Sequence, residues 1–310
     1  MSLPSRRLCR RLQWDELDVA PIRHLITLAR NEDVLGVGLL QAPSHCDDVS
    51  TDPALADSIA RATITAREKL TVCGQHLVPL VLEVYAAAGH ALPVSYRAAV
   101  GDGTTVSAGT VLGTVEGPAP LLLTAERVLL NFIQHLSGIA SLTRLHVEAM
   151  GETSTRLLDT RKTTPGYRLL EKYAVACGGG WNHRLGLYDR IMLKDNHLAS
   201  GGLNVADALT RRVETLRARY PDVPLEIEID SPDQLEAVLA VRPEVILLDN
   251  FTPDQLRAAV ETIAGQALTE ASGGVSLSTL PSLAHLGLDF ISCGALTHQS
   301  TWPDIGLDWE

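Results

Sequence analysis

The chain has 310 residues and a formal net charge of −11 at pH 7, and 45% of its residues are hydrophobic but only 4% aromatic. This length exceeds the usual size of one domain, so we expect one large domain and one smaller one. The aliphatic composition favours stacked parallel strands and helices. The acidic balance argues against a nucleic-acid partner or an anionic membrane, because either would need an extended basic face.

The cysteines indicate a reducing compartment. There are five, an odd number, and they are scattered without a CxxC pair, at positions 9, 46, 73, 177 and 293. We therefore expect a cytoplasmic protein without a zinc site. The run His45-Cys46-Asp47 does not change this expectation, since adjacent residues cannot easily face one ion and no second ligand cluster is recognisable. The most apolar window, 78–89, is too short to cross a membrane.

The first 124 residues predict a small α/β sandwich-like domain. Apolar spacing at 20–31 is typical of a surface helix, and the alternation over 62–72 is typical of a half-buried strand. A helix over 75–88 and short antiparallel strands over 96–115 follow, the latter broken by glycine-containing turns.

A long helix is predicted next, with Thr124 as its N-cap. Its apolar stripe comprises Leu129, Phe132, Ile133, Leu136 and Ala140. Arg127 would then lie in the first turn, where a cation opposes the helix dipole. A solvated arginine is the plain interpretation, and a functional one would explain the unfavourable position.

Beyond residue 150 the pattern changes to strand followed by helix, which predicts a parallel α/β barrel. The expected strands are 156–159, 190–194, 225–230, 245–249, 268–272 and 289–292. We place the domains at 1–124 and 125–310, and we expect the C-terminal tail to pack back on the N-terminal domain.

Polar residues follow the ends of these strands. Asp159 with Arg161 and Lys162, Lys194, Glu228 with Asp230, Asp249, Ser272 and Ser292 all stand there. In a parallel barrel the carboxyl ends of the strands share one rim, which carries the active site. The pattern therefore predicts a site with several cations and two or three carboxylates. Asp230 joins it only if its strand extends that far.

Two glycine-containing loops suggest phosphate binding at this rim. Ser272-Gly273-Gly274 precedes a predicted helix over 276–286, and Ser292-Cys293-Gly294-Ala295 follows the last strand. Such loops present backbone N–H groups beside helix N-termini. Ser-Gly-Gly alone would equally well be a tight turn.

The segment 156–197 is basic within an acidic chain. It holds eight Lys or Arg residues, at 156, 161, 162, 168, 172, 184, 190 and 194, against four acids, at 159, 171, 189 and 195. Local charge of the opposite sign predicts an anionic ligand. Arginines could grip carboxylates or phosphates through paired hydrogen bonds, while lysines supply point charges.

The order of motifs resembles the quinolinate phosphoribosyltransferase family. The motifs are DTRKTTPG from Asp159, GGG at 178–180 followed by Asn182-His183-Arg184, and LKDNH from Leu193. TAERVLLNFIQHLSGIAS from Thr124 and GALTH from Gly294 extend the match. The resemblance implies an α/β N-terminal domain followed by an incomplete TIM-like barrel, acting as a homodimer or a higher even homo-oligomer. It implies transfer of phosphoribosyl from phosphoribosyl pyrophosphate to quinolinate, with decarboxylation, in NAD biosynthesis.

The resemblance also places individual residues. Arg127 from a neighbouring subunit, Arg161, Lys162, His183, Arg184 and Lys194 would contact the pyridine dicarboxylate and phosphates. Glu228 and Asp249 would face the ribose and a magnesium ion, and Ser272, Gly273, Gly294 and His298 would lie near the 5′-phosphate. Lys162, Lys194, Glu228 and Asp249 are the expected catalytic residues. No organic cofactor is implied.

Several interpretations stay open at this point. His183 is as well explained by a structural role as by ligand binding, and Asp159 and Asp195 by orienting neighbouring cations. His197 could contact a helix N-terminus. A Schiff-base lyase using Lys194 or Lys162 would not explain the arginines. A non-catalytic anion-binding protein, or a related transferase acting on another heterocyclic carboxylate, would use the same rim.

Overall fold

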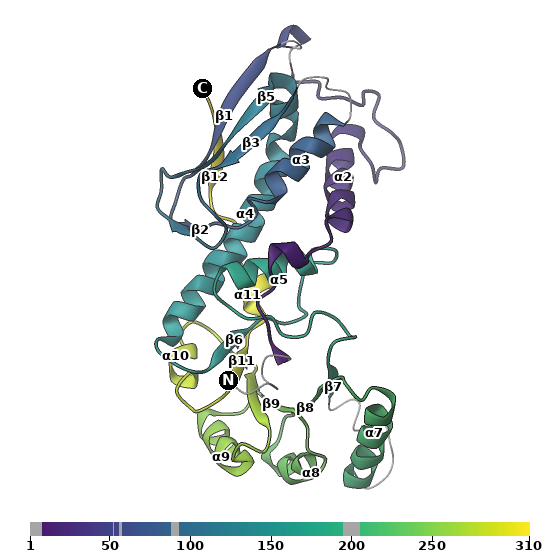
Figure 1. Ribbon diagram of the computed structural model, residues 1–310, viewed down its shortest axis with the longest axis vertical. Coiled ribbons are helices and arrows are strands. Elements are labelled where there is room, and N and C mark those ends of the chain that lie inside the picture. The colour runs from purple at the N-terminus through teal and green to yellow at the C-terminus, as the bar shows by residue number, and fades with distance from the viewer. Residues whose placement is uncertain (1–7, 52, 56–57, 88–92, 195–204) are drawn as a thin grey trace. The chain divides into compact units, whose positions relative to one another are not determined.

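The computed structural model describes residues 8–51, 53–55, 58–87, 93–194 and 205–310, which form two compact units (Figure 1). The first, here called the parallel unit, comprises Met1–Leu12, Thr143–Thr164 and Gly180–Gln299. The second, the antiparallel unit, comprises Gln13–Leu142, Pro165–Gly179 and Ser300–Glu310. Both units are thus assembled from segments that alternate along the sequence.

The antiparallel unit contains a four-stranded sheet in the order β12-β1-β5-β3. The strands are β1 (Ile59–Ala66), β3 (Ser95–Ala98), β5 (Val111–Pro118) and β12 (Ile305–Trp309). β12 pairs antiparallel with β1, with Leu307 opposite Ile64, so the last strand of the chain completes a sheet built from its first third. A smaller ladder joins β2 (Leu70–Thr71) to β4 (Thr105–Val106).

The helices of this unit follow from their apolar spacing and their caps. They are η1 (Trp14–Glu16), α2 (Val19–Leu35), η2 (Pro53–Leu55), α3 (Leu77–Ala86), α5 (Arg168–Cys177) and most of α4 (Ala119–Met150). The Asp18 side chain accepts the backbone N–H of Ala20, and Gly36 ends α2 in the left-handed conformation. α3 buries Leu77, Val78, Leu80, Val81, Leu82 and Tyr85.

The predicted start of the long helix was wrong. α4 begins at Ala119, and the Thr124 hydroxyl donates to the carbonyl of Pro120 at 2.9 Å, as in a helix interior. Pro120 explains the earlier start, because its fixed φ and missing N–H suit the first turn. Arg127 therefore lies beyond the first turn, where it is exposed and the dipole argument no longer applies.

The parallel unit contains a six-stranded parallel sheet in the order β6-β11-β10-β9-β8-β7. Its strands are β6 (Arg156–Leu158), β7 (Ile191–Leu193), β8 (Leu225–Ile229), β9 (Val245–Asp249), β10 (Leu268–Ser272) and β11 (Phe290–Ser292). Crossover segments carry α7 (Val205–Arg219), η4 (Pro232–Gln234), α8 (Leu235–Ala240), α9 (Pro253–Ile263) and α10 (Leu280–Leu283), and α11 (Ala295–His298) follows β11. All six predicted strands are present, which confirms the predicted fold class.

The helix expected over 276–286 is shorter than predicted. Only 280–283 is α-helical, although hydrogen bonds that cap a helix N-terminus precede it. The backbone N–H of Ser276 donates to the Thr279 hydroxyl at 2.9 Å, and that of Thr279 donates to the Ser276 hydroxyl at 3.3 Å. Reciprocal bonds of this kind start a helix, and the Leu280 N–H then donates to the Ser276 carbonyl at 2.9 Å, so the prediction erred in the length of the helix.

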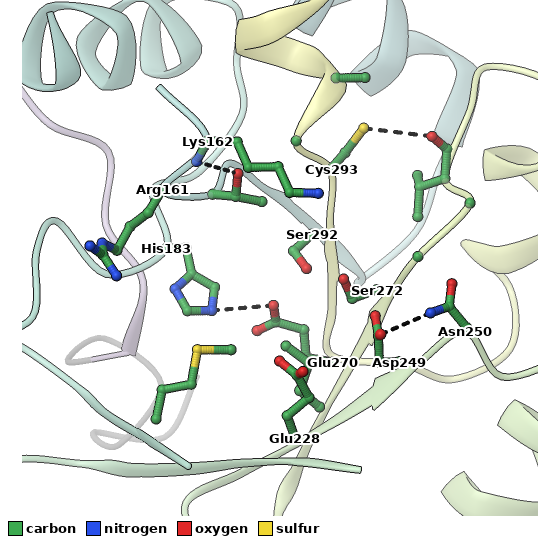
Figure 2. A pocket seen from close by; sticks show the side chains of 18 of the residues that line it. Arg161, Lys162, His183, Glu228, Asp249, Asn250, Glu270, Ser272, Ser292 and Cys293 are labelled. Carbon is green, nitrogen blue, oxygen red and sulfur yellow. Dashed lines mark hydrogen bonds and ion pairs between the residues drawn. The ribbon is translucent and has the colours of Figure 1, made fainter. Parts of the chain in front are cut away.

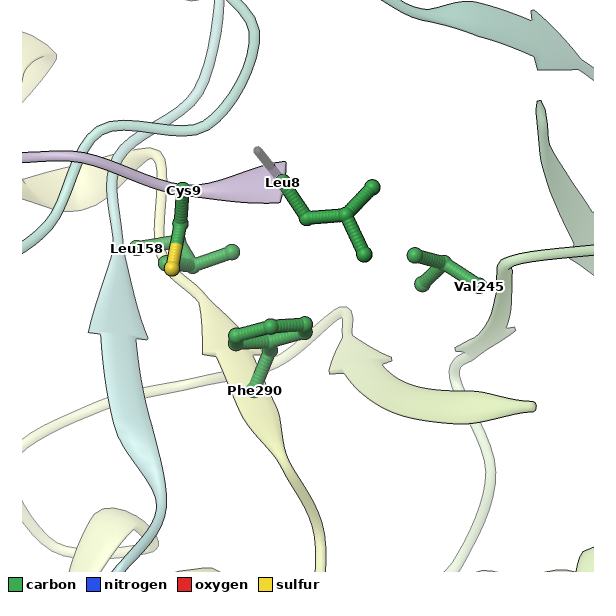
Figure 3. Close-up of a cluster of buried hydrophobic side chains, with 5 residues drawn as sticks. All are labelled: Leu8, Cys9, Leu158, Val245 and Phe290. Carbon is green, nitrogen blue, oxygen red and sulfur yellow. The ribbon is translucent and has the colours of Figure 1, made fainter. Parts of the chain in front are cut away.

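Apolar side chains fill part of the parallel unit, and two of them are the first residues of strands. Leu8 and Cys9 pack there against Leu158, Val245 and Phe290 (Figure 3). Val245 and Phe290 are the first residues of β9 and β11, so the chain's early segment covers this end of the sheet. The carboxyl ends remain available for a polar site. Among the described residues no helix combines the length and apolarity needed to span a membrane.

Candidate active site

A cavity of about 760 Å³ lies at the carboxyl ends of the parallel strands (Figure 2). It brings together eleven of the twelve residues predicted from the sequence, namely Arg161, Lys162, His183, Arg184, Lys194, Glu228, Asp249, Ser272, Gly273, Gly294 and His298. The twelfth, Arg127, is an exposed residue of α4 in the antiparallel unit. Asp195 and His197 lie outside the described residues, and Asp230 is exposed just beyond β8.

The loop after β6 is anchored so that it presents two cations. The backbone N–H of Lys162 donates to the Thr160 hydroxyl at 3.0 Å, and the Thr297 hydroxyl donates to the Lys162 carbonyl at 2.6 Å. Gly294 faces this loop, and a Cβ there would lie 2.8 Å from Lys162 Cδ and 3.3 Å from His298 Nε2. Glycine at 294 therefore lets the lysine and histidine share this space.

Arg161 and Arg184 place two guanidinium groups in the same cavity. Arg161 Nε is buried, and its N–H donates to no acceptor among the described residues. Burial, and next the charge of Arg161, lower the pKa of Arg184. Two guanidinium groups that repel each other gain from an anion placed between them. The arrangement therefore favours binding of a carboxylate or phosphate.

Lys194 and Glu228 form an ion pair across neighbouring strands at the rim. Glu228 belongs to β8, and Lys194 follows β7 directly, which places the two side chains on adjacent strand ends. The lysine side chain is 41% exposed and the glutamate 15%. Because solvent screens this pair, a charged ligand can replace either partner at a modest cost in free energy.

Asp249 is oriented by its neighbours at the end of β9. The Asn250 side-chain amide donates to Asp249 Oδ2 at 2.8 Å, and the Asn250 backbone N–H donates to the Ser272 carbonyl at 2.8 Å. Asn250 adopts φ 58°, a left-handed value that Asn tolerates. Gly273 has φ 90°, and a Cβ there would lie 2.1 Å from Asn250 Oδ1. Only glycine fits at 273 while Asn250 holds this position.

Below the rim is a buried charge layer, which we define as His183, Arg190, Glu226 and Glu270. Both glutamates are fully buried, and Arg190 is 2% exposed. Arg190 Nη1 donates to Glu226 Oε2 at 2.9 Å and lies 3.1 Å from His183 Nε2. Nε2 also lies 3.2 Å from Glu226 Oε2 and 3.3 Å from Glu270 Oε1. Of the four residues, His183 and Glu270 line the cavity.

The backbone around His183 is fixed by Asp159. Its two oxygens accept the His183 backbone N–H and the Asn182 amide, each at 2.8 Å. Asn182 in turn pairs with the early segment, because its N–H donates to the Arg10 carbonyl at 2.7 Å and its Oδ1 accepts the Leu12 N–H at 2.8 Å. Asp159 thus anchors the segment that carries His183 and Arg184.

Electrostatics couple the members of the buried charge layer. Burial lowers the pKa of His183, but the charges of Glu270 and Glu226 outweigh it and raise the pKa to about 9. Burial likewise raises the pKa of Glu226, but the His183 and Arg190 charges outweigh it and lower the pKa to about 2. The backbone N–H of Arg184 donates to His183 Nδ1 at 2.7 Å, which is the arrangement of a singly protonated ring.

Three groups of side chains could be considered as metal ligands. Glu228 and Asp249 line one cavity and offer hard oxygen ligands, which suit Mg²⁺. His183, Glu226 and Glu270 also converge, but the Arg190 guanidinium already lies against them. Cys73, Asp102 and Cys177 converge in the antiparallel unit, where Asp102 accepts the Gln75 N–H at 3.0 Å and the Tyr173 hydroxyl at 2.9 Å.

Sequence reasoning missed Glu226, Glu270, Arg190 and Asn250. A signal existed for the two glutamates, because each is an acid inside an otherwise apolar strand. Glu226 alternates with Glu228 in LEIEI, and Glu270 alternates with Ser272 in LTEAS, so each shares a strand face with a rim residue. Arg190 and Asn250 gave no comparable local signal.

The chain is similar to known proteins over most of its length. A family model described as the C-terminal domain of quinolinate phosphoribosyl transferase matches residues 139–308, and its N-terminal counterpart matches 48–137. The chain is similar to nicotinate-nucleotide pyrophosphorylase [carboxylating] of Mycobacterium leprae, with 44% identity covering 84% of this chain and 90% of that protein. It is also similar to the chloroplastic enzyme of that name from Arabidopsis thaliana, with 36% identity covering 88% and 81%. The crystal structure of nicotinate-nucleotide pyrophosphorylase from Ehrlichia chaffeensis superposes with a TM-score of 0.80 at 35% identity, covering 97% of this chain and 100% of that one.

Proposed function

The chain belongs to the quinolinate phosphoribosyltransferase family, and we propose that it transfers phosphoribosyl from phosphoribosyl pyrophosphate to quinolinate with loss of carbon dioxide. The products are nicotinate mononucleotide, pyrophosphate and carbon dioxide, so the enzyme is a pentosyltransferase of NAD biosynthesis. The observation that carries this proposal is the cavity itself, which sets Arg161, Lys162 and Arg184 beside Lys194 and faces them with three carboxylates.

Two anions must be held together in this reaction, and the cations explain how. Arg161 and Arg184 would bind the dicarboxylate through paired hydrogen bonds, while Lys162 and Lys194 would supply charge to phosphate and carboxylate oxygens. Ser272, Gly273, Gly294 and His298 would surround the 5′-phosphate. Binding both substrates in one cavity reduces the entropy cost of their reaction.

The carboxylates would act on the sugar. As pyrophosphate leaves, positive charge develops at the ribose carbon that accepts the pyridine nitrogen, and Glu228 or Asp249 would stabilise it. Asn250 keeps one oxygen of Asp249 hydrogen-bonded and so fixes its direction. When bound, Mg²⁺ would be held by Glu228 and Asp249, with water completing its shell, and would neutralise the departing pyrophosphate.

Decarboxylation then needs positioning more than acid–base chemistry. Once its nitrogen is alkylated, the pyridinium ring stabilises the carbanion that forms as carbon dioxide leaves. Lys162 or Lys194 would shield the departing carboxylate or deliver a proton to the ring carbon through water.

The acceptor can be tested by pyrophosphate release with quinolinate and with nicotinate, each with phosphoribosyl pyrophosphate and Mg²⁺. We expect pyrophosphate release with quinolinate only. Nicotinate has one carboxylate fewer, so part of the cationic pocket would stay without a counter-charge. Comparable turnover with nicotinate, or turnover only with another heterocyclic carboxylate, would contradict the proposal. Turnover that survives full removal of divalent cations would count against the magnesium role.

We also propose a homodimer, or a larger even assembly, in the cytoplasm, with Arg127 completing the site of the neighbouring subunit. The exposure of Arg127 supports this arrangement. Arg127→Ala and Lys162→Ala should each be inactive alone, whereas a mixture should regain part of the activity, because a mixed dimer has one site with neither change. No recovery, with subunit exchange demonstrated, would rule out a shared site.

A further inference from the structure

The buried charge layer contains more charge than the proposed reaction uses. Glu226 and Glu270 contribute two carboxylates, and neither oxygen of Glu270 accepts a hydrogen bond from the described residues. Arg190 contributes one guanidinium, 2.9 Å from Glu226 and 3.9 Å from Glu270. One negative charge is therefore left over in a fully buried position, which is costly unless something balances it.

A metal ion does not fit as the balancing charge. Arg190 Nη1 lies 3.1 Å from His183 Nε2 and within 4 Å of both carboxylates. The guanidinium thus occupies the space among the three side chains where an ion would have to bind. The remaining candidate is a proton, and His183 is the member that can take it as a cation.

His183 is turned so that its two nitrogens face different partners. Nε2 faces Glu226 and Glu270, while Nδ1 lies 2.7 Å from the backbone nitrogen of Arg184. A singly protonated ring donates from Nε2 and accepts the Arg184 N–H at Nδ1. A doubly protonated ring instead has a second donor beside that N–H, and two adjacent donors match one carboxylate oxygen.

We propose that Glu226 and Glu270 are positioning residues that keep His183 doubly protonated, so that its Nδ1–H and the Arg184 backbone N–H together bind one carboxylate oxygen of the acceptor. This inference rests on the proposed function, since the acceptor supplies the carboxylate. Both glutamates act through His183. The raised pKa of His183 agrees with this role, because the ring then stays a cation at neutral pH.

The groups that face His183 come from several elements. Glu226 belongs to β8, Glu270 to β10 and Arg190 to the segment before β7. The Cys9 thiol and Asp189 line a small adjacent cavity together with His183, Arg184 and Arg190. Asp189 is already occupied, because its carboxylate accepts the backbone N–H groups of Leu185 and Gly186. The two buried glutamates are therefore the groups to change.

The test is the pH dependence of the KM for quinolinate, measured from pH 6.5 to 10 in the full-length enzyme and in Glu270→Gln. A histidine with a raised pKa is a cation below that pKa and loses its charge as the pH rises through it. In the unmodified enzyme the KM should start to rise near pH 9, by up to about tenfold per pH unit. In Glu270→Gln the rise should begin at least about one pH unit lower, because one attracting charge is gone.

Two comparisons isolate this effect. The KM for phosphoribosyl pyrophosphate should follow the same pH profile in both enzymes. Glu261→Gln, which removes an exposed acid from α9 of the same unit, should superimpose on the unmodified enzyme for both substrates. If the Glu270→Gln profile also superimposes, the proposal is wrong. Loss of turnover in the unmodified enzyme at every pH would instead contradict the proposed function.

A second readout does not need turnover. Nitrogen NMR of the His183 ring, assigned by comparison with His183→Gln, should show protons on both ring nitrogens at pH 8 in the unmodified enzyme. In Glu270→Gln and in Glu226→Gln it should show one proton by that pH. A singly protonated His183 at pH 7 in the unmodified enzyme, with quinolinate bound, would overturn the proposal. Either glutamine variant suffices if the other does not fold.

Discussion

Two acids of the same strand, Glu226 and Glu228, show how depth changes what a charge can do. Both lie on one face of β8, two residues apart, and each contacts a cation from the neighbouring chain segment. Glu226 is fully buried with Arg190, whereas the Lys194 partner of Glu228 is 41% exposed. Water screens the outer pair, so its members are free to exchange partners with a ligand. Water does not screen the inner pair, so Glu226 and Arg190 hold each other in place and act on the charge of His183.

The largest effect should come from breaking the inner pair. Arg190→Met leaves two buried carboxylates without their guanidinium and should lower the free energy of unfolding by about 3–5 kcal/mol. The matched control is Arg257→Met in α9, because Arg257 also lies 2.9 Å from its acid, Asp254, but with 56% and 94% of the side chains exposed. That change should cost less than about 1 kcal/mol. Urea denaturation of both variants checks the difference, and equal losses would refute the contrast.

Removing charge from the rim should affect turnover and leave stability nearly unchanged. Lys162→Ala should lower kcat by about 100- to 1000-fold, the range for losing one preorganised charge contact. The reason is that the Lys162 side chain is exposed, so in the proposed reaction it would contact the substrates while supporting little of the fold. Steady-state kinetics together with thermal melting measure this, with Lys69→Ala, an exposed lysine of the antiparallel unit, as the charge-matched control. Near-normal turnover in Lys162→Ala would remove this residue from the site.

The buried charge layer should also make the free energy of unfolding depend on pH. Glu226 has its pKa lowered from 4.5 to about 2, so its contribution is present above pH 4.5 and is lost as the pH falls toward 2. His183 has its pKa raised from 6.5 to about 9, so its contribution is full below pH 6.5 and is lost as the pH rises through 9. The layer should therefore contribute most between pH 4.5 and 6.5, by about 2–3 kcal/mol relative to either extreme.

Urea denaturation at pH 3, 5.5 and 9.5 measures this dependence. Glu226→Gln should reduce the loss of unfolding free energy between pH 5.5 and pH 3, because the glutamine side chain takes up no proton. The exposed Asp254→Asn in α9 should leave the profile unchanged. A Glu226→Gln profile as steep as that of the unmodified protein would show that other groups control acid stability.

The smallest predicted effect concerns the loop that orients Asp249. Gly273→Ala places a Cβ against Asn250 at a φ of 90° and should cost about 1–3 kcal/mol in backbone strain. Because Asn250 must move, the KM for phosphoribosyl pyrophosphate should rise. Gly265→Ala is the control, since Gly265 also has a positive φ, 76°, but has nothing within 4 Å of the added Cβ. It should destabilise similarly while kinetics stay normal. Equal KM values in the two variants would contradict the role of Asn250.

The polar residues at the strand ends could be predicted from the sequence, whereas most of the buried charge layer could not, for a physical reason. Strand ends can be recognised locally, because apolar runs stop at Asp249 and Ser272, and parallel strands must align those ends. This explains why Lys194, Glu228, Asp249 and Ser272, which the strand pattern placed at one rim, line one cavity. The partners of Glu226 and Glu270 are non-local, since Arg190 and His183 are 36 and 43 residues away from Glu226 along the chain. Strand pattern alone does not assign such partners.

Two errors at helix ends have a similar origin. Thr124 was a plausible cap by residue type, but Pro120 starts α4 earlier. The segment 276–286 is apolar enough for a helix, and Ser276 and Thr279 cap its start, yet only 280–283 is α-helical. Apolar spacing locates a helix but does not fix the residues at which it begins and ends.

The most direct test of the proposed reaction is the ratio of carbon dioxide to pyrophosphate released from carboxyl-labelled quinolinate and phosphoribosyl pyrophosphate. Coupled transfer and decarboxylation predict one carbon dioxide per pyrophosphate throughout the time course. Pyrophosphate release without carbon dioxide would mean that the cavity transfers phosphoribosyl but does not decarboxylate. Carbon dioxide release without phosphoribosyl pyrophosphate would contradict the requirement for an alkylated ring nitrogen, and with it the proposed mechanism.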